Sequence, residues 1–349
     1  MIVTVTLNPS LDRAIEIDRL ARGDVIRARS GHLDPGGKGV NVSRALLANG
    51  VASRAVLPCG GDEGAQLVRL LAEEGVDLVA VPIGGHTRSN ITLAEPDGTV
   101  TKINEPGPTL SPVEFDAVMG QVLAAAETAD WVVVSGSLPP GVTAEAFGRL
   151  CRRIVASGVN LAVDTSGPAL RSAAEAGAHL VKPNREELSD VVGGDLTSLS
   201  DVVEAARRVR TWGAGAVLAS LGADGAVLVT AHTVVSGESP VDTPRSSVGA
   251  GDALLAGFLA AVAGRPPAAA DIDGGPAAPH TPPQAADPSA TERVDKRPFL
   301  ALALAEGLAW GAAAVRLPGS RMPGPSDLRR EAVVIHPESD PVRSLTPQG

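Results

Sequence analysis

A glycine-rich turn followed by an acidic residue stands at the start of an apolar helix in the last third of the chain. The segment 247–258 reads Ser-Val-Gly-Ala-Gly-Asp-Ala-Leu-Leu-Ala-Gly-Phe, so Asp252 falls in the first helical turn. Small residues let the backbone turn tightly, so that the N–H groups of Gly249, Ala250 and Gly251 point outward as an anion site. A neighbouring carboxylate can take the proton of an attacking hydroxyl while those N–H groups hold a phosphoryl group in transit. The same letters also fit a purely structural role, an N-capping aspartate after a glycine turn.

A second glycine motif lies far upstream, at 35–46, and reads Pro-Gly-Gly-Lys-Gly-Val-Asn-Val-Ser-Arg-Ala-Leu. Gly36 and Gly37 allow a ligand to approach the backbone closely, and Lys38 offers a point charge suited to phosphate. Asn41 follows one turn later and can offer its amide to a sugar hydroxyl. The G-x-x-x-x-G-K-[ST] spacing of a P-loop is absent. Glycine-rich helix starts are common, so this motif by itself fits a ligand site or an ordinary helix start.

The two motifs, in this order and separation, resemble the two signature sequences of the ribokinase-like (PfkB) sugar kinases. The resemblance runs from Thr4 to about Leu328, and four further segments match the family's pattern. They are Thr-Leu-Asn-Pro-Ser-Leu-Asp at 6–12, Ser-Gly-Ser-Leu-Pro-Pro-Gly at 135–141, Lys-Pro-Asn-Arg-Glu-Glu at 182–187 and Ser-Leu-Gly-Ala-Asp-Gly at 220–225. Within the family the chain resembles the 1-phosphofructokinases. The resemblance implies an α/β fold with a mostly parallel sheet and a small β lid, a kinase domain over 1–328, and a tail over 329–349.

The resemblance also implies roles for individual residues. Asp252 is the general base, and Gly249, Ala250 and Gly251 form the anion hole for direct in-line transfer from ATP. The substrate side comprises Asp12, Arg27, Gly36, Gly37, Lys38, Asn41, Arg88, Asn90 and Ser137. The ATP side comprises Lys182, Asn184, Ser220, Leu221, Gly222, Ala223, Asp224, Gly225 and Gly251.

The N-x-x-E element of the family falls on Asn184 and Glu187, which the resemblance associates with Mg²⁺ held through water. Their spacing is equally that of an N-cap asparagine and a glutamate at the third helical position. Both interpretations can hold at once.

The identity of the substrate depends on whether it already carries a phosphate. Arg27, Lys38 and Arg88 occupy positions that resemble those receiving this phosphate in phosphosugar kinases, and arginine suits bidentate phosphate contact. Each arginine can instead be a solvated surface residue. The expected reaction is ATP-dependent conversion of fructose 1-phosphate to fructose 1,6-bisphosphate. The alternatives are a tagatose-6-phosphate kinase or 6-phosphofructokinase, a kinase for an unphosphorylated sugar, and a non-catalytic sugar sensor, against which the presence of Asp252 argues.

Short apolar runs alternate with helical patterns along most of the chain. The predicted strands are 2–7, 53–57, 77–81, 131–134, 159–163, 179–181 and 216–220. The predicted helices are 63–74, 112–127, 144–156, 168–176, 199–212 and 299–315. Such alternation predicts βαβ units, a mostly parallel sheet, and ligands at the carboxyl ends of the strands. Ser137, Asn184 and Gly222 each follow a predicted strand directly, as that rule requires.

Two regions depart from this alternation of strands and helices. Segments of about 14–30 and 87–103 alternate and predict extra strands, with an Asp97-Gly98 hairpin turn in the second. In the family such strands form a lid over the sugar that pairs with the lid of a second subunit, which implies a homodimer. An ordinary surface hairpin is the alternative. The segment 264–297 is rich in proline and alanine without apolar periodicity, which predicts a disordered insertion.

Composition excludes several classes of partner. The net charge of −10 over 349 residues argues against nucleic acid and anionic membranes. The two cysteines, Cys59 and Cys151, form no CxxC motif, which favours a reduced cytosol. No targeting signal and no run of eighteen apolar residues is present. A cytoplasmic enzyme with a small-molecule substrate is therefore expected.

Overall fold

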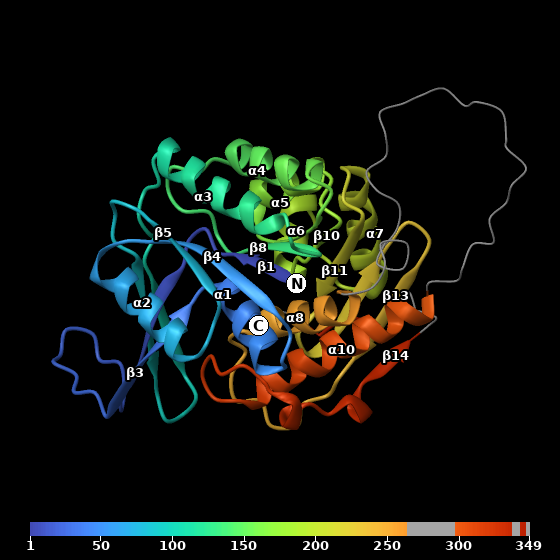
Figure 1. The fold of residues 1–349 in the computed structure, drawn as a ribbon. Helices are drawn as coiled ribbons and strands as arrows, with labels where there is room; N and C mark the ends of the chain where they lie inside the picture. The colour runs from blue at the N-terminus through green and yellow to red at the C-terminus, as the bar shows by residue number, and fades with distance from the viewer. Residues whose placement is uncertain (264–296, 337–342, 347–349) are drawn as a thin grey trace, which may run out of the picture.

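The computed structural model describes residues 1–263, 297–336 and 343–346, and its centre is a ten-stranded sheet (Figure 1). The strand order is β14-β13-β12-β11-β10-β9-β8-β1-β4-β5. From β5 to β11 all neighbours pair in parallel, which confirms the predicted sheet. The bounds are β1 (Ile2–Val5), β4 (Ser53–Cys59), β5 (Leu78–Pro82), β8 (Trp131–Ser135), β9 (Asn160–Asp164), β10 (Leu180–Val181), β11 (Ala216–Ser220), β12 (Ala226–Val229), β13 (Val234–Glu238) and β14 (Val334–His336).

Helices cover both faces of this sheet (Figure 1). One face carries α3 (Pro112–Ala126), α4 (Ala144–Ala156), α5 (Gly167–Glu175), α6 (Arg185–Val192) and α7 (Leu199–Thr211). The other carries α1 (Lys38–Ala48), α8 (Ala250–Val262) and α10 (Arg297–Arg316), while α2 (Gly61–Glu73) packs beside β4. Strand side chains alternate between the two cores, since Val3 and Val5 join the first core and Ile2 joins the second. The parallel strands are therefore buried on both sides, as their continuous apolar runs predict.

Helix α10 is long and apolar enough to cross a membrane by length and composition alone. Its most apolar stretch is 61% buried inside the protein, and it packs along α8. These contacts identify α10 as a core helix.

A separate four-stranded sheet has the order β3-β2-β6-β7 and forms the predicted lid. Its strands are β2 (Ser10–Glu16), β3 (Ser30–Gly36), β6 (Arg88–Ala94) and β7 (Val100–Asn104). The second predicted segment, 87–103, is confirmed, and Gly98 in its turn has a φ of +90°. The first segment, 14–30, is placed wrongly, because residues 17–29 are a loop between β2 and β3.

The error in the first lid segment has a physical cause. The second glycine motif, which begins at Pro35, is interpreted from the sequence as a ligand site or a helix start, yet Pro35 and Gly36 end β3. Because β3 lies at the edge of its sheet, the missing N–H of Pro35 disrupts no further ladder.

The carboxyl-terminal part adds structure that the sequence did not predict. The expected tail over 329–349 includes β14, which extends the large sheet by pairing with β13. Three short 3-10 turns, η1 (Gly222–Asp224), η2 (Pro325–Asp327) and η3 (Arg330–Ala332), complete the described elements. The predicted insertion at 264–297 lies outside the described residues apart from Arg297, where α10 begins.

Candidate active site

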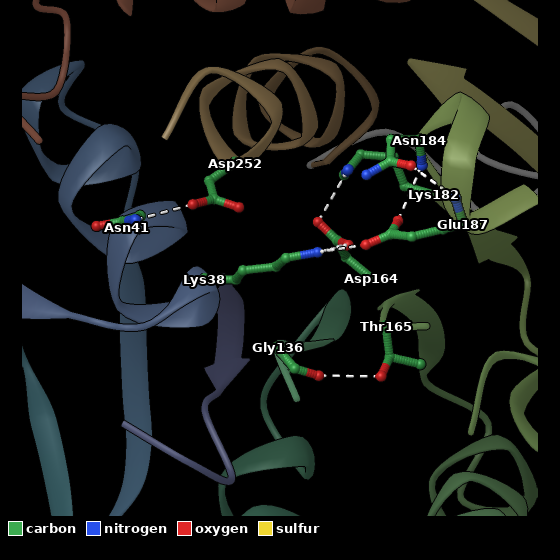
Figure 2. A network of polar contacts seen from close by, with 9 residues as sticks. All are labelled: Lys38, Asn41, Gly136, Asp164, Thr165, Lys182, Asn184, Glu187 and Asp252. Atoms are coloured by element: carbon green, nitrogen blue, oxygen red, sulfur yellow. Dashed lines mark hydrogen bonds and ion pairs between the residues drawn. The ribbon is translucent and has the colours of Figure 1, made fainter. Parts of the chain in front are cut away.

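Polar side chains gather where the carboxyl ends of β8 to β11 meet the first turns of α1 and α8 (Figure 2). Asp164 ends β9, Lys182 follows β10, and Lys38 opens α1. Gly136 follows β8 with a φ of +112°, and its carbonyl accepts a hydrogen bond from the Thr165 hydroxyl at 3.0 Å. The site therefore occupies the edge of the sheet that a parallel α/β fold offers to ligands.

Asp252 lies in the first turn of α8, where it is buried. Its Oδ2 accepts a hydrogen bond from Nδ2 of Asn41 at 2.8 Å. Gly249 caps α8 in the left-handed conformation, with a φ of +77°, and no side chain caps the helix N-terminus. Burial, and after it the negative charge of Asp164, raises the pKa of the Asp252 carboxyl to about 6. The arrangement combines a carboxylate suited to proton transfer near neutral pH with a helix terminus suited to an anion.

Lys38 points its ammonium group at two carboxylates. Its Nζ lies 2.8 Å from Oδ1 of Asp164 and 3.1 Å from Oε1 of Glu187. The other oxygen of Asp164, which is wholly buried, lies 2.9 Å from Nζ of Lys182. Burial alone would raise the pKa of Asp164, but the Lys182 and Lys38 ammonium groups lower it. Burial alone would lower the pKa of Lys38, but Asp164 and Glu187 raise it. One buried carboxylate therefore holds an ammonium group on each oxygen.

Asn184 and Glu187 form a capping box at the start of α6. Oδ1 of Asn184 accepts from the Glu187 N–H at 2.7 Å, and Oε2 of Glu187 accepts from the Asn184 N–H at 2.9 Å. The structural interpretation of this pair is thus confirmed. Among the described residues, no group of three or more His, Cys, Asp and Glu side chains could hold a metal ion. Both side chains keep oxygen lone pairs, so the pair still fits a hydrated Mg²⁺ bound through water.

A second polar cluster lies on the lid. Oδ1 of Asp12 accepts hydrogen bonds from the Ser10 hydroxyl at 2.7 Å and from Nδ2 of Asn90 at 2.9 Å. A Cβ atom on Gly36 would overlap the Asp12 carboxylate and the Ser10 hydroxyl oxygen, so a larger residue there would displace these side chains. Oδ1 of Asn90, like Oδ1 of Asn41, is buried and has no hydrogen-bond partner within the described residues. Buried acceptors without partners are costly, so both amide oxygens suit hydroxyl donors of a ligand.

Arg88 joins this cluster to the main sheet through Asn8. Its Nη2 donates to the Asn8 carbonyl at 3.0 Å, and its Nη1 donates to the Glu105 carbonyl at 3.1 Å. Nδ2 of Asn8 donates in turn to the Ser137 hydroxyl at 3.3 Å. The buried Nε of Arg88 has no partner in the described part of the chain. Arg88 is thus held by backbone carbonyls, without a carboxylate to neutralise it in these bonds.

The strand register explains why polar residues share one face of the lid. Ser10, Asp12 and Ala14 lie opposite Arg88, Asn90 and Thr92 in the parallel pair of β2 and β6. Alternate residues of a strand point to opposite faces, so the intervening residues lie on the other side. That other side is mostly apolar and comprises Leu11, Arg13, Ile15, Leu33, Ser89, Ile91, Leu93 and Ile103.

The predicted ATP loop, 220–225, follows β11. Its Ser220 N–H donates to the Pro183 carbonyl at 3.0 Å, and Ser220 forms a bridge with Asn184, so the loop lies beside the N-x-x-E element. Residues 222–224 form the turn η1, and Gly225 has a φ of +89°.

The structure brings most of the predicted residues into these two clusters, with two differences. The charges acting on Lys38 come from Asp164, Glu187 and Asp252, whereas those acting on Arg88 come from Asp12 and Glu105. Lys38 therefore lies on the Asp252 side of the site. Arg27 lies on the exposed loop 17–29, and the structure shows no contact from it to either cluster.

Two residues central to the site were not assigned from the sequence. Asp164 directly follows the predicted strand 159–163, and this position at a strand's carboxyl end was the available signal. Asn8 belongs to the segment 6–12 that matches the family, but the sequence assigned it no role of its own. Its bonds to residues far along the chain could not be read from that segment.

Comparison with known proteins agrees with this geometry. Residues 5–270 match the pfkB family carbohydrate kinases. A 1-phosphofructokinase of Rhodobacter capsulatus is 38% identical over 262 residues, covering 74% of this chain and 82% of the relative. The ATP-dependent 6-phosphofructokinase isozyme 2 of Escherichia coli is also 38% identical, over 73% of this chain and 83% of the relative.

A solved structure gives the same result for the fold. Phosphofructokinase-2 from Escherichia coli, crystallised in complex with potassium, superposes with a TM-score of 0.80 at 32% identity. The superposition covers 93% of this chain and 96% of that chain. With the signature motifs, the buried Asp252 and these matches together, the chain belongs to the pfkB family of carbohydrate kinases.

Proposed function

We propose that this phosphotransferase moves the γ-phosphate of ATP to a hydroxyl group of fructose 1-phosphate, forming fructose 1,6-bisphosphate. The observation that carries the proposal is the buried Asp252 carboxylate at the N-terminus of α8, which no side chain caps. A base and an anion site are thereby combined in a single helical turn, as phosphoryl transfer to an alcohol requires.

Asp252 takes the proton of the attacking sugar hydroxyl as that oxygen forms a bond to the γ-phosphorus. The bond from phosphorus to the bridging oxygen of ATP breaks, and ADP leaves with that electron pair. The N–H groups of Gly249, Ala250 and Gly251 hold the oxygens of the group in transit, and for this the Ala250 N–H gives up its long bond of 3.4 Å to the Ser247 carbonyl. Lys38, whose charge acts on Asp252, adds a cation on the same side. The proton then passes from Asp252 to solvent.

The substrate side would bind the sugar through Asp12 and the amide oxygens of Asn41 and Asn90, which accept no hydrogen bond from the described part of the chain. Gly36 and Gly37 let the sugar approach the backbone, and the Ser137 hydroxyl adds a contact. Arg88 would receive the phosphate that the sugar already carries, since its Nε–H has no partner within the described residues. Arg27 would reach this phosphate only if the loop 17–29 moved toward the site.

The ATP side would use the loop from Ser220 to Gly225 together with Lys182 and Asn184. Asn184 and Glu187 would hold Mg²⁺ through water, and the ion would neutralise charge on the phosphates of ATP. Both substrates are anionic, so the cations Lys38, Lys182 and Arg88 offset the chain's negative net charge locally.

Fructose 6-phosphate and tagatose 6-phosphate are the alternative substrates, and relatives of both phosphofructokinase types match this chain equally well by identity. Initial rates with ATP and each of the three sugar phosphates, beside unphosphorylated fructose, test the proposal. The highest kcat/KM is expected with fructose 1-phosphate. Preference for unphosphorylated fructose, or ATP turnover with none of them, would overturn it.

We propose further that two copies of the chain pair through their lids in the cytoplasm. The exposed apolar side chains of the lid region support this, since Val100 and Ile103 are each 53% exposed and Val25 is 86% exposed. Light scattering after size exclusion is expected to report a dimer, which Ile103→Glu should weaken.

Replacing Arg88 with alanine is expected to raise the KM for the sugar phosphate roughly ten- to a hundredfold, because a charge-assisted hydrogen bond to phosphate is lost. The KM for ATP should change little. Steady-state kinetics with each substrate varied in turn measures the split.

Arg149→Ala is the matched control, since Arg149 is exposed on α4, outside the lid. Turnover of unphosphorylated fructose is the second control and should not respond to Arg88→Ala. Equal losses with both sugars would mean that Arg88 only shapes the lid.

The pH dependence follows from the pKa of Asp252, which is raised to about 6. A base must be ionised, so kcat/KM is expected to be level above pH 7 and to fall about tenfold per pH unit below 6. A pH–rate profile in constant ionic strength measures this limb. A profile that stays level down to pH 5 would contradict the assignment of Asp252 as the base.

A further inference from the structure

A short segment near the carboxyl end, 343–346, is tied to the start of α7. The Leu199 N–H donates to the carbonyl of Arg343 at 3.0 Å, and the Leu345 N–H donates to the carbonyl of Thr197 at 2.9 Å. The side chain of Leu345 is buried and belongs to the core on that face of the sheet. Two backbone bonds and a buried leucine therefore fix this segment to the folded domain.

The same segment reaches the loop 220–225. The Thr346 N–H donates to Oδ2 of Asp224 at 2.8 Å, and the Thr346 hydroxyl donates to Oδ1 at 3.0 Å. Both oxygens of the Asp224 carboxylate are thus bound by one residue. Arg343 forms an ion pair with Glu238 at the end of β13, the strand next but one to β11. The segment bridges α7, β13 and η1.

The loop itself is restrained on its other side. Gly225 has a φ of +89°, and a Cβ atom there would overlap the carbonyl oxygen of Gly237. The Leu221 N–H donates to the Gly225 carbonyl at 2.8 Å, which closes the turn. Between these fixed ends lies Asp224. In the described part of the chain, its carboxylate accepts its hydrogen bonds from Thr346.

We propose that residues 343–346 form a strap that positions the nucleotide-binding loop through Thr346 and Asp224. The strap lies beyond the region 5–270 that matches the family model. The proposal rests on the proposed function, since it takes the loop to bind ATP. Asp224 is a positioning residue here, because its carboxylate is occupied by the strap. If the loop is ordered before ATP binds, the entropic cost of binding is smaller.

Leu345→Ser removes the buried anchor of the strap and is the main test. The KM for ATP is expected to rise roughly three- to tenfold, while kcat and the KM for fructose 1-phosphate stay within twofold. Leu302→Ser is the matched control, because Leu302 is 68% exposed on α10. Leu345→Met keeps an apolar anchor and should restore the KM for ATP.

Thr346→Val tests the contact without disturbing the anchor, since it removes the hydroxyl donor and keeps the N–H. A smaller rise in the KM for ATP is expected. Hydrogen exchange of the amides at 221–225 should be faster in Leu345→Ser than in the wild type, with exchange in the lid strands unchanged.

The outcomes separate the strap from the proposed function. If the wild type turns over ATP, an unchanged KM for ATP in both variants overturns the strap. Equal losses in kcat and both KM values also overturn it, because they indicate general destabilisation. If the wild type turns over no sugar phosphate, the proposed function fails. The strap is then tested by hydrogen exchange alone. Equal exchange at 221–225 in Leu345→Ser and in the wild type overturns the strap.

Discussion

Replacing Asp252 with asparagine is expected to lower kcat by a factor of roughly 10²–10⁴, the usual contribution of a general base. The amide keeps the size of the side chain and can still accept the hydrogen bond that Asn41 donates. The KM values for both substrates should therefore change little. Steady-state kinetics with the sugar phosphate and ATP measures the loss, and Asp116→Asn, on the exposed face of α3, is the matched control.

The same variant is expected to gain stability at neutral pH. Folding raises the pKa of the Asp252 carboxyl from 3.8 to about 6, so the folded protein holds this proton more tightly than the unfolded chain. The stability that this group contributes is present below pH 3.8 and is lost as the pH rises through 6. Asparagine is neutral throughout, so the free energy of unfolding should rise by about 1–3 kcal/mol at pH 8 and hardly at pH 4. Urea unfolding at both pH values measures the gain.

Opposite results for Asp252→Asn would separate the two arguments. A kcat close to that of the wild type would remove Asp252 from the base role. Loss of stability at pH 8 would mean that the charged carboxylate makes bonds in the folded state beyond the one from Asn41. Loss of activity together with a gain in stability is the pattern expected of a group placed for catalysis against the preference of the fold.

The parallel sheet could be predicted because its strands are buried on both faces and therefore read as uninterrupted apolar runs. Residues 131–134 and 216–220 are examples, and both match strands to within a residue. Ser137, Asn184 and the loop after β11 were assigned from the resemblance to the family, and they follow such strands, as expected for ligand-binding residues of a parallel sheet. The antiparallel strands β12 and β13 were missed, because two strands joined by a short turn did not fit the strand–helix alternation.

The pairing of charges inside the site could not be predicted from the sequence. Lys38 is separated from Asp164 by 126 positions and from Glu187 by 149, and only the folded sheet brings them together. The sequence showed a lysine in a glycine motif, which fits any phosphate. Its position beside Asp164, Glu187 and Asp252 decides which side of the site it serves. Local patterns thus predicted several of the residues that come together at the candidate site, and the tertiary structure determines how their charges are paired.

Substitution of Asp164 is the most direct test of how the charges in the site are paired. Asp164→Asn removes the carboxylate charge that binds Lys38 and Lys182, and Lys182 is only 3% exposed. Removing one partner from a buried ion pair costs about 3–5 kcal/mol, because the remaining charge stays buried without compensation. The Tm is therefore expected to fall by roughly 5–15 °C. Asp77→Asn is the matched control, since Asp77 and its partner Arg54 are exposed and such pairs contribute less than about 1 kcal/mol.

A second readout tests whether Asp164 acts on the base as well as on stability. Its negative charge raises the pKa of Asp252, so the acid limb of the pH–rate profile should move to lower pH in Asp164→Asn. Simple destabilisation would lower the rate at every pH and leave the limb in place. A stable variant with an unmoved limb would show that Lys38 and Lys182 find other partners and that Asp164 is not the centre of the network.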